Sequence, residues 1–397
     1  MIEREGRFRP LASRLARAVA ALLAVAFVAV ALAACGTSSS DDDGGGDGGE
    51  GDITLGYTAT LSGEFASYGT EMEDGVDLAV KEINQDGGVD GRQLKVDAED
   101  DLGKPGNGPV VAQKFCDNSS VSAVLGYSFS SVALAAVPIY TQCGLPVLAS
   151  AVTSPELSGA SPMFFRNVLN DDFQGSEMGK YAVEKLGYEN IAVLNQKDDY
   201  GIGTSDGFIE GVEDAGGTIT SRDEYQLGTT SFDSQLATIK KDDPDAIYIG
   251  GFYAEASKIA TQAQALGLNQ PLLGTDGSLS PDLIKLGGDA VDGMYVYGVF
   301  SPAPHDEATD RFVKDYKAAN GEEPTSWAAL AYDAVYTVKA AIEKTGDASR
   351  QGIADGLGEI SYDGITGPTT FDENGDRQGR VLFLQVKNGK FVLAEDQ

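Results

Sequence analysis

Short apolar strands alternate with amphipathic helices along almost the whole chain from residue 53 onward. A strand at 53–58 precedes apolar residues at helical spacing over 72–83, and the alternation continues to a buried strand at 146–149. Thr70 and Glu73 have the spacing of a capping box, which places the start of the first helix there. Strands and helices in this order form parallel sheets with helices on both faces. The pattern therefore predicts a doubly wound α/β fold.

The same alternation begins again after residue 171. The chain beyond residue 52 is also longer than one hydrophobic core usually serves. We therefore expect two doubly wound parallel-sheet lobes joined by three hinge crossings, near 166–170, 297–302 and 365–371. A helix at 325–344 should return the chain to lobe 1, and a hairpin at 381–393 should belong to lobe 2. The expected domain boundaries are 53–168 and 299–367 for lobe 1, and 169–298 and 368–397 for lobe 2.

Residues 1–34 have the anatomy of a bacterial export signal peptide. Five arginines precede an apolar run at 18–33, which is shorter than the roughly 20 residues that cross a bilayer. The run ends in Leu-Ala-Ala directly before Cys35, as at a lipoprotein processing site. We expect Cys35 to be lipidated and to tether an extracytoplasmic domain to the cell membrane through lipid alone, the alternative being a membrane-spanning anchor. After the lipidated Cys35, the linker up to residue 52 has no apolar residue and should be flexible.

The balance of charge is strongly acidic. The chain carries 61 Asp and Glu against 29 Lys and Arg, a formal net charge of −32. Such a charge argues against nucleic acid and anionic membrane surfaces as partners. Its plainest consequence is solubility.

Motifs of catalysis are poorly supplied, so we expect no enzyme. Segment 126–130 departs from the Gly-x-Ser-x-Gly pattern of serine hydrolases, and the chain offers only His305 as a partner. The turn after the first strand lacks the glycine pattern of a dinucleotide site. Residues 372–377 begin like a calcium loop but have arginine where glycine is required, so a tight turn is expected. We expect no metal and no cofactor.

Two cysteines remain besides Cys35, and an exported protein meets an oxidising compartment. Cys116 and Cys143 end the helices that follow the second and third strands. In a doubly wound sheet these helices are neighbours on one face. The positions favour a Cys116–Cys143 disulfide over two buried free thiols, and either role is structural.

Polar and aromatic residues follow the strands of both lobes, where open α/β sheets bind ligands. They occupy 60–63 with Tyr68, 126–131, 150–156, 198–201, 250–253 and 274–277. Each segment alone is typical of helix caps and turns. Their recurrence at the strand ends of both lobes predicts a ligand site between the lobes.

With these motifs the chain resembles the leucine/isoleucine/valine-binding group, the type I periplasmic substrate-binding proteins of ABC importers. The resemblance covers essentially residues 53–393. It rests on 61–63 with 68–69, 87–91, 151–156, 199–201, and 371–376. It implies a monomer that binds a small molecule and serves an ABC permease with its ATPase subunits.

The resemblance also implies a site for an α-amino acid. Ser130 and Thr153 match the positions whose hydroxyls, with backbone groups of Ser130, Ala151 and Thr153, hold the carboxylate and share the ammonium group. Asp276 matches the acid that binds the ammonium. The positions that wall the side-chain pocket are Tyr68, Phe129, Tyr200, Phe252 and Trp327; for Phe129 and Trp327 a place in the core is the alternative.

Three of these positions depart from the leucine-type pattern. Phe129 stands where that protein has a disulfide cysteine, Phe252 replaces a tyrosine, and Asp276 is shorter than the usual glutamate. The expected ligand is an apolar, branched-chain L-amino acid. The alternatives are a binding protein for an amide, urea or aromatic acid, or the ligand-binding subunit of a membrane sensor.

Overall fold

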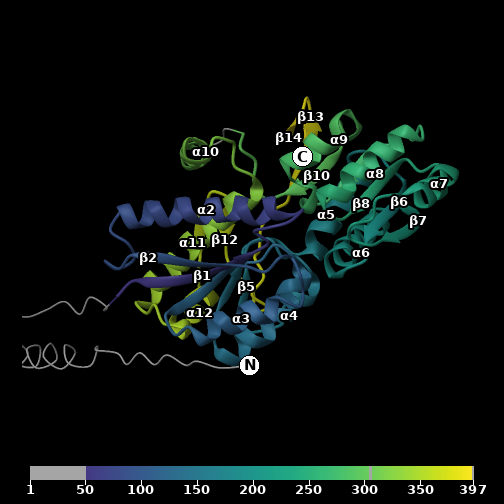
Figure 1. Cartoon of the computed structure of the whole chain (residues 1–397). Coiled ribbons are helices and arrows are strands. Elements are labelled where there is room, and N and C mark those ends of the chain that lie inside the picture. Colours follow the sequence, from purple (N-terminus) through teal and green to yellow (C-terminus); the bar gives the residue numbers. More distant parts are fainter. Residues whose placement is uncertain (1–50, 304–305, 396–397) are drawn as a thin grey trace, which may run out of the picture. The chain divides into compact units, whose positions relative to one another are not determined.

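A computed structural model describes residues 51–303 and 306–395. In this part of the chain two large β-sheets and a two-stranded one form, and helices pack against both of the large sheets (Figure 1). None of its helices is long and apolar enough to cross a membrane. The expected signal peptide, Cys35 and the linker as far as residue 50 lie outside the described residues.

The first sheet has five parallel strands in the order β2-β1-β3-β4-β5. The chain moves outward from β1 in both directions, which is the doubly wound arrangement that was expected. The strands are almost wholly apolar where helices cover both faces. Their bounds are β1 (Ile53–Ala59), β2 (Leu94–Asp100), β3 (Val121–Gly126), β4 (Val147–Ala149) and β5 (Phe164–Arg166).

Helices from two distant parts of the chain cover this sheet. They are α2 (Ala66–Gln85), α3 (Gly108–Asp117), α4 (Ser130–Cys143), α10 (Glu307–Asn320), α11 (Ser326–Thr345) and α12 (Arg350–Gly358). A Cβ at Gly75 of α2 would lie 2.2 Å from the carbonyl oxygen of Ala328, so glycine lets α11 approach α2 closely. The helix expected at 325–344 is α11, and it packs against α2.

The start of the first helix was misplaced. It begins at Ala66 rather than Thr70, and its N-cap residue makes no side-chain capping hydrogen bond. The Thr70 hydroxyl donates back to the carbonyl of Ala66 one turn earlier. The capping-box spacing of Thr70 and Glu73 therefore lies inside the helix.

The second sheet has seven strands in the order β14-β13-β10-β9-β8-β6-β7. The strands from β7 to β10 are parallel neighbours, and the hairpin of β13 and β14 adds to β10 in antiparallel fashion. The hairpin expected at 381–393 is formed by β13 and β14 at one edge of this sheet. The bounds are β6 (Asn190–Gln196), β7 (Thr218–Tyr225), β8 (Ala246–Gly250), β9 (Leu272–Gly274), β10 (Tyr295–Gly298), β13 (Leu382–Lys387) and β14 (Lys390–Leu393).

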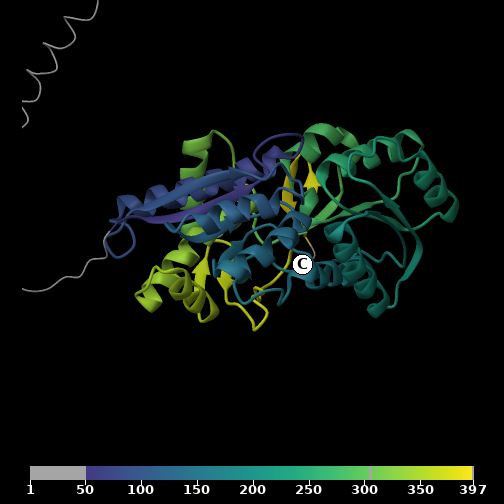
Figure 2. The same cartoon turned by 60° about the horizontal axis from the view of Figure 1, so that its bottom comes forward.

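Lobe 2 has its own set of helices. They are α5 (Asp171–Glu184), α6 (Asp199–Asp214), α7 (Asp233–Asp242), α8 (Tyr253–Ala265) and α9 (Pro281–Gly287), with the 3-10 turns η2 (Asp276–Ser278) and η3 (Gly288–Val291). In Figures 1 and 2 these teal and green segments stay together, apart from the purple and blue segments of lobe 1.

Three stretches of chain connect the sheets. The first leads from β5 to α5, and the second follows β10. The third follows a small hairpin of β11 (Tyr362–Gly364) and β12 (Gly367–Thr369). In this third stretch Asp376 forms an isolated β-bridge with Arg166 of β5. The chain joins the seven-stranded sheet only at Leu382. The turn η1 (Pro155–Leu157) lies between β4 and β5.

The structure joins Cys116 and Cys143 in a disulfide, with the two Cα atoms 5.9 Å apart. Cys116 lies in the last turn of α3 and Cys143 ends α4, so the bond links two neighbouring helices of lobe 1. The bridge closes a loop of sequence separation 27.

We predict that Cys116→Ser with Cys143→Ser lowers the free energy of unfolding by roughly 3 to 4 kcal/mol, because the open loop gives the unfolded chain more freedom. Urea unfolding of the variant and the native chain measures the difference. Alkylation of the unfolded, unreduced native chain provides the chemical check. Two reactive thiols there would contradict the disulfide.

Candidate functional site

The residues expected to bind a ligand come from both lobes and meet between them. Eight of the nine are buried, and Ala151, in the loop after β4, is half-buried. Lobe 1 contributes Tyr68 from α2, Phe129 and Ser130 at the start of α4, Ala151, Thr153, and Trp327 from α11. Lobe 2 contributes Tyr200 from α6, Phe252 before α8, and Asp276 at the start of η2.

Asp276 is the polar centre of the lobe 2 side. Its carboxylate accepts hydrogen bonds from the Tyr200 hydroxyl at 2.6 Å, from Gln174 Nε2 at 3.1 Å and from the Gly277 N–H at 2.8 Å. Burial raises the pKa of Asp276, and these hydrogen bonds lower it in part. No cationic side chain donates a hydrogen bond to this carboxylate among the described residues. Its charge therefore calls for a positive partner when ionised.

A second buried carboxyl, Asp171, stands near Asp276 as the first residue of α5. Neither of its oxygens makes a hydrogen bond of good geometry in the described part of the chain, although the Thr153 hydroxyl is close enough to lower its pKa in part. Burial, and then the charge of Asp276, raise the pKa of Asp171 well above its ordinary value. The sequence gives no sign of this role, since an acid in the first turn of a helix is common. Gln174, one turn further along α5, escaped notice in the same way.

Two hydroxyl residues of lobe 1 lie in adjoining loops. The Ser130 Oγ accepts a hydrogen bond from the N–H of Ser154 at 3.3 Å, which fixes the start of α4 against the loop after β4. Thr153 precedes Ser154, and its carbonyl accepts the N–H of Asp171 at 2.9 Å. The chain thus brings Ser130, Thr153 and Asp171 into one polar group.

The five aromatic residues form a connected wall. Phe252 stacks on Tyr200 with ring centroids 4.8 Å apart. Phe129 and Phe252 make an edge-to-face contact, also with centroids 4.8 Å apart. Tyr68 contacts Phe129 at 6.2 Å, Phe252 at 5.8 Å and Trp327 at 5.9 Å. All five expected wall residues are therefore brought together.

Contacts across the lobe boundary hold this wall closed. The Tyr68 hydroxyl of lobe 1 donates to the carbonyl of Gly277 in lobe 2. The Tyr253 hydroxyl of lobe 2 donates to the carbonyl of Glu64 at 2.9 Å, and its ring contacts Phe65. The sequence motifs did not identify Phe65, and they included Tyr253 only as the last residue of segment 250–253.

Several buried polar atoms of this region have no hydrogen-bond partner among the described residues. They are the Thr153 hydroxyl, both Asp171 oxygens, the Gln174 side-chain oxygen and the Trp327 Nε1. Unsatisfied buried polar groups are costly and rare, and they require explanation. The set offers both acceptors and donors, so a ligand that carries both kinds of group would satisfy it.

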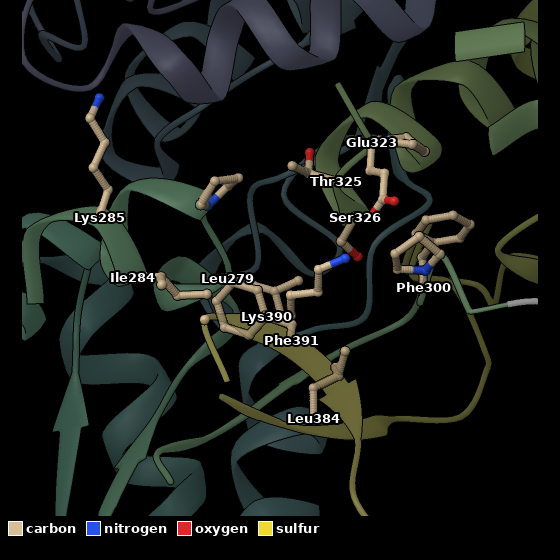
Figure 3. A pocket seen from close by; sticks show the side chains of 14 residues that line it. Leu279, Ile284, Lys285, Phe300, Glu323, Thr325, Ser326, Leu384, Lys390 and Phe391 are labelled. Atoms are coloured by element: carbon tan, nitrogen blue, oxygen red, sulfur yellow. The ribbon is translucent and has the colours of Figure 1, made fainter. Parts of the chain in front are cut away.

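A separate cavity of about 320 Å³ lies between α9, the β13–β14 hairpin and the start of α11 (Figure 3). Leu279, Phe300 and Phe391 give it a largely apolar lining. In Figure 3 the Lys390 side chain extends across the cavity, whereas Lys285 points away from it. None of the nine expected site residues lines this cavity. The five unpartnered polar atoms named above belong to the region of the aromatic wall and not to this cavity, although other buried polar atoms without a partner among the described residues, such as the Tyr225 hydroxyl, lie elsewhere.

The part of the chain that the structure describes holds no group of three or more His, Cys, Asp or Glu side chains arranged to bind a metal ion. The polar groups at the aromatic wall are carboxylates, hydroxyls, an amide and an indole N–H. Such a set suits hydrogen bonding to a small polar molecule.

Residues 52–390 match the family described as periplasmic binding protein. The chain is 30% identical over 346 residues to the leucine-, isoleucine-, valine-, threonine- and alanine-binding protein of Pseudomonas aeruginosa, covering 86% of this chain and 89% of that relative. It is 29% identical over 331 residues to the Leu/Ile/Val-binding protein of Escherichia coli K12, covering 83% and 89%.

Solved structures agree with these relatives. The leucine-binding protein LivK of Thermotoga maritima has a TM-score of 0.82 and 30% identity, covering 86% of this chain and 97% of that one. LivJ of Streptococcus pneumoniae, solved with isoleucine, has a TM-score of 0.81 and 31% identity at the same coverage. The family match and the two-lobed fold lead to one conclusion: this chain belongs to the periplasmic binding protein family and has its type I fold.

Proposed function

We propose that the chain binds an apolar L-α-amino acid, with the branched-chain set favoured, between its lobes and delivers it unchanged to an ABC importer. The family consists of extracytoplasmic solute-binding proteins, which are not enzymes. The observation that carries the proposal is the buried Asp276 carboxylate, which lies at one end of the aromatic wall that reaches Ser130.

An ammonium group is the partner that the acids favour. Asp276 and Asp171 are both fully buried and lie near each other, so their charges repel when both are ionised. A cation between them offsets that repulsion and the loss of hydration. The Gln174 side-chain oxygen offers a further acceptor for its N–H groups.

A carboxylate is the group that lobe 1 favours. Ser130 begins α4, and the free N–H groups and dipole of a helix N-terminus favour negative charge. The Thr153 hydroxyl can add a hydrogen bond. No arginine is required for this mode of binding, and the apolar wall then receives the ligand side chain.

The names of relatives support this ligand class. The Escherichia coli protein is named for leucine, isoleucine and valine, and the Streptococcus pneumoniae structure contains isoleucine. A protein from Rhodopseudomonas palustris solved with benzoate has a TM-score of 0.79 but only 23% identity, so it speaks for the fold alone. An aromatic acid or a neutral amide carries no cation and would leave Asp276 without its charge partner.

A thermal-shift panel of amino acids, amides and aromatic acids tests the proposal. A ligand present at 1,000 times its dissociation constant adds about 4 kcal/mol of stability, which is readily measured. We expect apolar L-amino acids to raise the melting temperature. The D-enantiomers of these amino acids, and simple neutral amides, should leave it unchanged. A shift by amides, urea or aromatic acids alone would replace the amino-acid proposal with one of those alternatives.

Closure of the lobes over the ligand is the proposed mechanism, with bending at the three connecting stretches. Opening at these stretches would separate Ser130 and Thr153 from Tyr200, Phe252 and Asp276, and closure over a ligand would restore the contacts across the lobe boundary. We expect small-angle scattering to report a smaller radius of gyration when a binding amino acid is added. No compaction with a ligand of proven affinity would contradict the hinge.

Lipid attachment at Cys35 is proposed from the sequence alone. We expect the native chain to cofractionate with membranes and Cys35→Ala to leave them, because the lipid is the only expected anchor. Equal membrane recovery of both chains would contradict the anchor.

The importer role is separated from a sensor role by adding the liganded chain to its permease and ATPase subunits, where stimulated ATP hydrolysis is expected.

A further inference from the structure

Phe129 occupies a special place in the aromatic wall. It is the last residue before α4, directly next to Ser130, and its side chain is 6% exposed. Its ring contacts Phe65 at 5.6 Å and Tyr68 at 6.2 Å in lobe 1, and Phe252 at 4.8 Å in lobe 2. It is therefore a lobe 1 ring that meets lobe 2 directly.

A glycine holds this ring in place from behind. A Cβ at Gly103, in the loop after β2, would lie 2.8 Å from the Phe129 ring and 3.0 Å from the Thr60 hydroxyl. Gly103 also has φ +63°, a conformation that side chains disfavour. The ring rests on bare backbone there, so it cannot retreat in that direction when a ligand enters.

The ring also belongs to a continuous aromatic surface that leads to Asp276. Phe252 stacks on Tyr200, whose hydroxyl donates to Asp276. A continuous surface of rings thus runs from Asp276 to Phe129, the neighbour of Ser130. An amino acid that reached from Ser130 to Asp276 would lie along this surface, with its side chain beside Phe129.

We infer that Phe129, fixed between Gly103 and Phe252, limits the length of the ligand side chain, so that the site prefers alanine and valine to leucine and phenylalanine. This inference rests on the proposed function and narrows its ligand class. One methylene in an apolar pocket changes discrimination by about 10- to 200-fold. We therefore expect valine to bind at least about 10-fold more tightly than leucine, and phenylalanine more weakly still.

Calorimetric titration of alanine, valine, leucine and phenylalanine into the native chain, Phe129→Ala and Phe129→Leu tests the inference. Phe129→Ala should improve the affinity for leucine and phenylalanine relative to valine by about 10-fold or more. Phe129→Leu should change the same affinity ratio in the same direction, but by less. It tests the inference even if Phe129→Ala does not fold. The matched control is Phe115→Ala, a buried phenylalanine of α3 that packs under Gly56.

The control should lower stability without changing the order of affinities. Leucine binding as tightly as valine to the native chain, or an unchanged ratio in both Phe129 variants, would overturn the size limit alone. Binding of no amino acid by the native chain would overturn the proposed function, and this inference with it.

Discussion

Replacing Asp276 by asparagine is expected to weaken amino-acid binding by on the order of 2 to 5 kcal/mol, about 30-fold to several thousand-fold. Asparagine keeps the shape of the side chain and can still accept the Tyr200 hydroxyl hydrogen bond. It removes the charge, however, so the ligand ammonium would be buried against a neutral amide. The effect is large because the site is closed and water cannot take over the role of the acid.

Titration of valine and leucine into the native chain and Asp276→Asn measures the loss. Asp214→Asn, at the exposed end of α6, removes one charge from the same lobe and should bind as the native chain does. Without ligand, Asp276→Asn should be no less stable than the native chain. Burial raises the pKa of Asp276, and an isolated buried charge is unfavourable. Affinity within threefold of the native chain would remove Asp276 from the site.

Much of the fold was predictable because periodicity reports burial. The strand at 53–58 and the helix expected at 325–344 each bury a face, and both lie close to their expected bounds. Short elements carry too little pattern, and β5, β11 and β12 have only three residues each. The start of α2 was misplaced because tertiary contacts decide it. The Tyr57 hydroxyl donates to the carbonyl of Gly69, within the first turn of the helix.

The candidate site was predictable where residues follow strands. Asp276 and Tyr200 come after strands of one lobe, and the fold joins them by a hydrogen bond of 2.6 Å. Asp171 begins a helix after a crossing, where acids are frequent for reasons of helix stability. Phe65 lies just before α2 and packs across the lobe boundary. The roles of Asp171 and Phe65 depend on how the two lobes meet, and a local sequence pattern does not predict that.

A buried ion pair ties the third connecting stretch to the first. Arg166 at the end of β5 is fully buried, and its Nε donates to Asp376 Oδ1 at 2.7 Å. The Ser158 hydroxyl donates to the other oxygen of Asp376 at 2.6 Å, and Arg166 also donates to the carbonyl of Ser154 at 2.8 Å. Burial raises the pKa of Asp376, but the hydrogen bond and charge of Arg166 outweigh it, so the pKa lies below its ordinary value.

Arg166→Met is therefore expected to lower the free energy of unfolding by about 3 to 5 kcal/mol, because it leaves the Asp376 carboxylate buried without its partner. Adding Asp376→Leu should recover a large part of that loss, since the pair is then replaced by apolar groups. Lys197→Met is the control. It breaks the exposed pair with Glu224, whose N–O distance is 2.9 Å, and should cost less than about 1 kcal/mol.

Urea unfolding of the four chains at neutral pH measures these differences. The depressed pKa of Asp376 means that the pair stabilises the fold above the ordinary carboxyl range and loses its effect as the pH falls through the lowered value. The gap between the native chain and Arg166→Met should therefore narrow in acid. If Arg166→Met cost no more than Lys197→Met, the ion pair would not hold the third connecting stretch. The bending proposed for ligand closure would then need another fixed point on the lobe 1 side.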